Sequence, residues 1–133
     1  MELNLKIAGV FLMAVALMHV VFPKRFNWEV ELSSLSLMNK QMMQVHTFFV
    51  AFTVFLMGLF CLTSASDLVK TPLGNKLALG LGIFWSVRLF IQFFVYSSKL
   101  WKGKAFETVM HVSFSLLWAY LSVVFFYIYF QPV

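Results

Sequence analysis

Charged residues are scarce in this sequence. Only 11% of its 133 residues are Asp, Glu, Lys or Arg, whereas soluble domains carry about 25%. Hydrophobic residues make up 62% of the chain, and the mean hydropathy is +0.88. This balance excludes a water-soluble fold and predicts an integral membrane protein surrounded by the lipid bilayer.

Cysteine and the common catalytic motifs are scarce or missing as well. The single Cys61 excludes an internal disulfide. The sequence contains no Gly-rich phosphate loop, no Cys-x-x-Cys pair and no His-Glu-x-x-His motif, so several enzyme classes are set aside. The net charge of +5 would indicate nucleic acid for a soluble protein, but the basic residues here lie mostly in turns. Membrane orientation explains them better, and we expect no nucleic-acid partner.

Four apolar runs reach the length of about 20 residues that crosses a bilayer. We predict spans over residues 3–22, 41–62, 77–96 and 105–130, all in one domain covering 1–133. The expected fold class is all-α, an antiparallel bundle of four transmembrane helices. Between the first two spans Leu32, Leu35 and Met38 recur at helical spacing, which predicts a short amphipathic helix in the interface.

The basic residues are distributed unevenly between the two membrane faces. The face with the first and third connections carries more of them than the face with both termini and the second connection (Lys24, Arg25, Lys40, Lys99, Lys102 and Lys104 against Lys6, Lys70 and Lys76). Lys and Arg are enriched in cytoplasmic loops. The richer face is therefore predicted to be cytoplasmic, with both termini on the other side of a bacterial-type cytoplasmic membrane.

Polar residues interrupt the third and fourth runs at helical spacing. The third run carries Arg88, Gln92 and Tyr96 at four-residue steps, and the fourth carries a similar stripe (Glu107, His111, Ser115, Trp118 and Ser122). Arginine inside an apolar span costs at least roughly 2.5–3.5 kcal/mol of insertion free energy. Arg88 therefore needs an internal partner, and a salt bridge to Glu107 is one candidate.

The three histidines of the chain fall at similar depths in three different spans. At a rise of about 1.5 Å per residue, His19, His46 and His111 lie roughly 7, 9 and 10 Å inside the nearest flanking lysine. Three imidazoles in one layer near one face favour a shared site in the leaflet on the cytoplasmic side.

Such a layer fits two kinds of cofactor. Two of the histidines would supply the axial nitrogens of a b-type haem, with Arg88 neutralising its propionates. Alternatively, His19, His46 and His111 would bind a copper, zinc or iron ion, with Glu107 accepting the other N–H of a ligating histidine. Gln92 and Tyr96 are candidate hydrogen-bonding groups for a cofactor or a quinone. The leading interpretation is a small haem- or metal-binding membrane protein that serves electron transfer.

Other interpretations of the same residues stay open. The histidines would also serve as interhelical hydrogen-bonding groups that fix packing. The polar stripes would suit a non-catalytic subunit or assembly factor of a larger membrane complex, including an oligomer of this chain. A proton or ion path is a further alternative.

Overall fold

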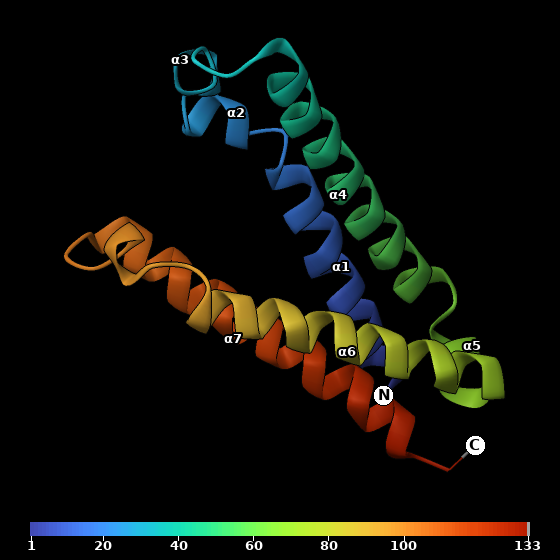
Figure 1. Ribbon diagram of the computed structural model, residues 1–133. Helices are drawn as coiled ribbons and strands as arrows, with labels where there is room; N and C mark the ends of the chain where they lie inside the picture. Colours follow the sequence, from blue (N-terminus) through green and yellow to red (C-terminus); the bar gives the residue numbers. More distant parts are fainter. Residues whose placement is uncertain (133) are drawn as a thin grey trace. The chain divides into compact units, whose positions relative to one another are not determined.

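Residues 1–132 are described in a computed structural model, and they form helices and connections without a strand. Three helices are long and apolar enough to cross a membrane: α4 (Leu37–Thr63), α6 (Pro72–Phe94) and α7 (Ala105–Phe130). Figure 1 shows them as the long green, yellow and orange-red helices. The predicted all-α class is confirmed, and the three helices indicate a membrane protein.

The chain divides into two compact units. The N-terminal unit is Leu3–Ala65, and the C-terminal unit comprises residues 66–132 together with Met1 and Glu2. The N-terminal unit contains most of α1 (Glu2–Met18), then α2 (Phe22–Arg25), α3 (Trp28–Glu31) and α4. The C-terminal unit contains most of α5 (Ala65–Lys70), then α6, the 3-10 turn η1 (Ser98–Leu100) and α7.

Two glycines bring α1 and α4 into backbone contact in the N-terminal unit. A Cβ atom added to Gly58 would lie 2.7 Å from the carbonyl oxygen of Gly9, and one added to Gly9 would lie 2.7 Å from that of Gly58. Helices approach this closely only where residues without bulky side chains face each other. This contact is therefore what sets the packing of α1 on α4.

The connection between α1 and α4 differs from the prediction. Helix α1 ends at Met18, and Pro23 lies in the first turn of α2, where its missing N–H costs nothing. The predicted interfacial helix is not formed: Leu32 follows α3, Leu35 lies in the connection to α4, and Met38 belongs to α4. The connection instead contains α2 and α3, each of four residues. Helix α4 begins at Leu37 because the Ser36 hydroxyl accepts a hydrogen bond from the Asn39 N–H at 3.2 Å.

In the C-terminal unit α6 and α7 pack side by side. Helix α6 begins at Pro72, five residues before its predicted start, because the Thr71 hydroxyl caps it by accepting from the Gly74 N–H at 2.9 Å. Residues 72–76, which the sequence prediction left between the second and third spans, therefore belong to α6. Helix α7 has the predicted bounds.

Asn75 ties the start of α6 to the end of α7. Its side-chain N–H group donates to the carbonyl oxygens of Tyr129 at 2.8 Å and Ile128 at 3.3 Å. Carbonyls in the last turn of a helix have no partner within the helix, so an outside donor stabilises that end. The pair α6–α7 is thereby held at the end opposite to the polar residues described next.

Candidate functional site

Three polar side chains form a hydrogen-bonded chain across α6 and α7. Arg88 Nη1 donates to Gln92 Oε1 at 3.2 Å, and Gln92 Nε2 lies 3.0 Å from His111 Nδ1. Arg88 and Gln92 are four residues apart on α6 and share a face, while His111 comes from α7. Gln92 is buried, and the other two are half-buried. The two polar stripes of the sequence therefore meet here, in what we call the Arg88–Gln92–His111 chain.

The chemistry of arginine fixes the direction of every bond in this chain. A guanidinium group only donates, so Gln92 must turn its oxygen towards Arg88 and its NH₂ group towards His111. His111 Nδ1 then accepts, which places the imidazole proton of the neutral ring on Nε2. Among the described residues, most of the unused hydrogen-bonding capacity of the chain consists of donors, from the other N–H groups of Arg88, the second N–H of Gln92 and the Nε2–H of His111. The second lone pair of Gln92 Oε1 is its one unused acceptor.

Trp101 covers the imidazole ring of His111. The two rings stack with centroids 4.6 Å apart and an interplanar angle of 17°. The Thr108 hydroxyl on α7 donates to the Trp101 carbonyl at 2.7 Å and holds this turn against the helix. Gly103 adopts φ +77°, a left-handed conformation that glycine accepts without strain, and this lets the chain turn back into α7. Sequence reasoning missed Trp101, whose one signal is an aromatic residue two positions before a glycine in a basic turn.

Arg88 also contacts two aromatic rings. Its Cζ atom lies 5.4 Å from the centroid of the Tyr96 ring and 5.2 Å from that of Trp118. Such cation–π contacts stabilise a guanidinium group that is partly removed from water. Tyr96 makes its contact although α6 ends two residues earlier, at Phe94. Among the described residues, Arg88 contacts neutral groups, and the predicted salt bridge to Glu107 is not among these contacts. Glu107 is half-buried and lies one turn before His111 on α7.

Two buried indole groups lie deeper along the same pair of helices. Trp85 and Trp118 stack with centroids 4.9 Å apart and an interplanar angle of 11°. They are 2% and 4% exposed, and within the described residues their Nε1–H groups have no hydrogen-bond partner. Buried donors without acceptors are rare in folded proteins. Sequence reasoning interpreted both residues as packing aromatics and missed these donors.

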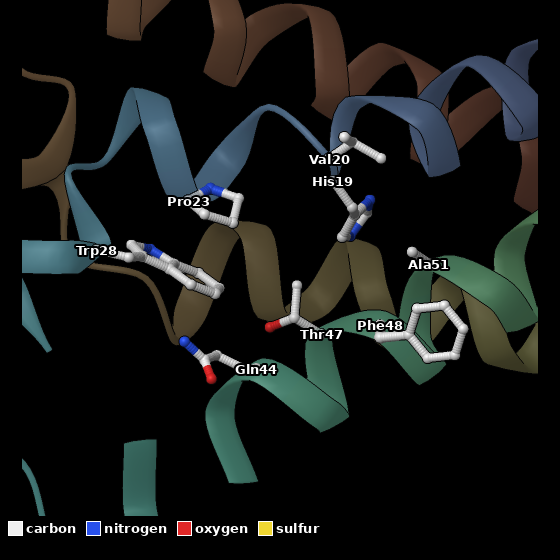
Figure 2. A pocket seen from close by; sticks show the side chains of 8 residues that line it. All are labelled: His19, Val20, Pro23, Trp28, Gln44, Thr47, Phe48 and Ala51. Atoms are coloured by element: carbon white, nitrogen blue, oxygen red, sulfur yellow. The ribbon is translucent and has the colours of Figure 1, made fainter. Parts of the chain in front are cut away.

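His19 lines an open groove in the N-terminal unit (Figure 2). Its Nδ1 lies 2.9 Å from the Val15 carbonyl, which can only accept, so Nδ1 carries the proton and Nε2 has a lone pair. The groove has a volume of about 190 Å³ and is lined mainly by apolar groups from both sides (His19, Val20, Pro23, Trp28, Gln44, Thr47, Phe48 and Ala51). This volume is below the roughly 300–1,000 Å³ that is usual for ligand pockets.

His46 does not line the groove with His19. The α4 residues that do are spaced three or four apart and form one face of the helix. At about 100° per residue, His46 lies on roughly the opposite face. Its side chain is exposed. The N-terminal unit therefore does not bring the two imidazoles to one ligand position.

The residues also give little support to a bare metal ion. Across residues 1–132 there is no group of three or more His, Cys, Asp or Glu side chains that could hold one. In the C-terminal unit the Nδ1 lone pair of His111 is already used by Gln92. Nor does the chain of bonds favour a proton path, because it ends on arginine, which cannot accept a proton from Gln92.

The fold and the polar centre define a helical membrane protein with a hydrogen-bonded site between two long apolar helices. The amino-acid sequence matches no protein-family model and no curated protein, and the fold matches no solved structure.

Proposed function

We propose that the protein binds the head group of a membrane-soluble quinone at the Arg88–Gln92–His111 chain and serves electron transfer. The observation that carries this proposal is the direction of the hydrogen bonds, which leaves donors from Arg88 and His111 towards a ligand. A ligand that meets mainly donors must bring acceptors. Quinone carbonyl oxygens are acceptors, and the quinone ring is apolar enough to reach a site within the span.

The surroundings of the chain support a flat ring as ligand. Trp101 lies against His111, and the rings of Tyr96 and Trp118 lie near Arg88. Aromatic side chains favour stacked or edge-to-face contacts with other rings. Gln92 lies on α6, a helix long and apolar enough to cross a membrane, and a lipid-soluble carrier reaches such a site more readily than a water-soluble anion.

The topology that accompanies this proposal is a bundle of four spans. Helix α1 has 17 residues, which lies at the lower limit of roughly 17–25 for a transmembrane helix. With α1 as the fourth span, the basic residues in the α1–α4 and α6–α7 connections favour a cytoplasmic location for both connections, and the proposal puts both termini on the other side. The Arg88–Gln92–His111 chain is then near the cytoplasmic face.

Titration with a quinone tests the proposed function. Purified protein in detergent micelles is expected to bind decylubiquinone one-to-one in isothermal titration calorimetry. His111→Phe and Arg88→Met each remove a donor, and each should raise the Kd about tenfold or more. Far-ultraviolet circular dichroism should show unchanged helix content in both variants.

His46→Phe is the matched control, because it removes an exposed imidazole from α4 and should leave the Kd unchanged. Failure of the wild-type protein to bind the quinone would contradict the proposal. Equal losses in His46→Phe and His111→Phe would contradict it as well. Displacement of the quinone by an anionic phospholipid, but not by a zwitterionic one, would assign the donors to an anionic lipid head group instead.

The haem and metal-ion hypotheses stay predictions. One observation favours His19 as a ligand: it lines the groove, and the bond of its Nδ1 to a backbone carbonyl leaves the Nε2 lone pair available. A Soret band, or stoichiometric copper, zinc or iron that is lost on His19→Ala, would support them. A colourless, metal-free protein that also fails to bind quinone would favour a subunit or assembly factor of a larger membrane complex.

A further inference from the structure

We propose that the site extends deeper between α6 and α7 to Trp85 and Trp118, whose indole N–H groups bind a second acceptor oxygen of the same ligand. This inference rests on the proposed function and specifies the ligand class further. The ligand carries two acceptor oxygens at opposite ends of a ring, as a para-quinone does. A carboxylate or a phosphate, whose oxygens share one atom, would satisfy only one end.

The first support is the state of the two indole groups. An indole N–H can only donate, and both groups are buried without an acceptor among residues 1–132. Burying such a donor is unfavourable unless something accepts its hydrogen bond. Phenylalanine at either position would keep an aromatic ring without that cost. The indole groups are therefore accounted for by a ligand oxygen that meets them.

The second support is that these donors belong to the same cluster as the Arg88–Gln92–His111 chain. Trp118 lies against Arg88, with 5.2 Å from Cζ to the ring centroid, and Trp85 stacks on Trp118 at 4.9 Å. Trp85 precedes Gln92 by seven residues on α6, and Trp118 follows His111 by seven on α7. Along the helices, the level of Trp85 and Trp118 is therefore roughly 10 Å from the level of Gln92 and His111, and Arg88 lies between the two levels.

The third support is that donors predominate in this cluster. Arg88, His111, Trp85 and Trp118 each offer N–H donors, whereas the one acceptor of the Arg88–Gln92–His111 chain with a lone pair left, Gln92 Oε1, already receives the Arg88 N–H. A ligand whose polar groups only donate, such as an ammonium ion, would gain little here. Two carbonyl groups on a flat ring match both levels of the site.

The experiment compares two ligands on Trp→Phe variants. The ligands are decylubiquinone, with carbonyls at both ends of its ring, and a cyclohexenone with the same tail and one carbonyl. Trp85→Phe and Trp118→Phe should each weaken the quinone about fivefold in calorimetry, the effect of one hydrogen bond. Binding of the ketone, whose oxygen is held at the Arg88 and His111 end, should not change. Trp28→Phe, in the N-terminal unit, should change neither affinity.

The outcomes separate this inference from the proposed function. Failure of the wild-type protein to bind the quinone overturns both. Quinone binding that is weakened by His111→Phe but not by Trp85→Phe or Trp118→Phe overturns only the inference. Equal weakening of quinone and ketone by the tryptophan substitutions also overturns it, because the indoles would then act through packing. Helix content and thermal midpoint are measured on each variant to show that it is folded.

Discussion

Replacing Gly58 by leucine is expected to lower the free energy of unfolding by about 3 kcal/mol or more. The new Cβ alone would lie 2.7 Å from the Gly9 carbonyl oxygen, 2.8 Å from Met13 Cγ and 3.0 Å from the Met13 nitrogen. Two of these atoms belong to the backbone of α1, which cannot move aside without a shift of the whole helix. The measurement is unfolding by SDS in mixed micelles, followed by circular dichroism.

Glycine-to-alanine changes provide a control, because the free energy of unfolding is expected to rise at one glycine and to fall at the other. Alanine favours a helix over glycine by roughly 1 kcal/mol, so Gly80→Ala should stabilise the protein, since nothing lies within 4 Å of its added Cβ. Gly58→Ala should destabilise it despite the same gain in helix propensity. Stabilisation by both changes would show that α1 and α4 do not meet at Gly9 and Gly58.

Replacing Gln92 by leucine is expected to lower the free energy of unfolding by about 2–3 kcal/mol and to abolish measurable quinone binding. The substitution removes the acceptor of Arg88 and the donor of His111 together, at a side chain that is 8% exposed. Leucine itself favours insertion of a spanning helix by about 0.3–0.6 kcal/mol. A loss of stability would therefore report the broken chain of hydrogen bonds rather than a change in hydrophobicity.

Gln44→Leu is the matched control for this prediction. Gln44 is an exposed residue on α4 at the rim of the groove shown in Figure 2. The same chemical change there should be neutral or stabilising and should leave quinone affinity as in the wild-type protein. If both leucine variants were equally stable and bound quinone equally well, Gln92 would not link Arg88 to His111.

The fold was predictable as far as local chemistry determines it. Apolar runs of sufficient length predicted the three long helices, and the bounds 105–130 of α7 were predicted correctly. The predicted starts of α4 and α6 were too late because hydropathy does not register the caps at Ser36 and Thr71. The contact of Gly9 with Gly58 was not predicted, because pairing glycines of two helices requires knowledge of which faces meet.

Depth along a helix is predictable from residue counting, whereas direction around it depends on packing. Counting placed His19, His46 and His111 in one layer, but His46 is exposed on a face of α4 away from the groove that His19 lines. The four-residue steps of Arg88 and Gln92 predicted their shared face correctly. That His111 meets Gln92, and that Trp101 stacks on His111, follows from the packing of α6 on α7.

Determining the tautomer of His111 tests most directly whether the Arg88–Gln92–His111 chain presents hydrogen-bond donors to a ligand. Nitrogen-15 solid-state NMR of histidine-labelled protein in bilayers distinguishes protonated from unprotonated ring nitrogens, and the His111→Phe spectrum assigns the signal. We predict an unprotonated Nδ1 and a protonated Nε2 for His111, with the opposite pattern for His19, whose Nδ1 donates to Val15. A His111 ring protonated at Nδ1 would mean that Gln92 turns its oxygen to histidine, and the proposed binding of quinone by these donors would be contradicted.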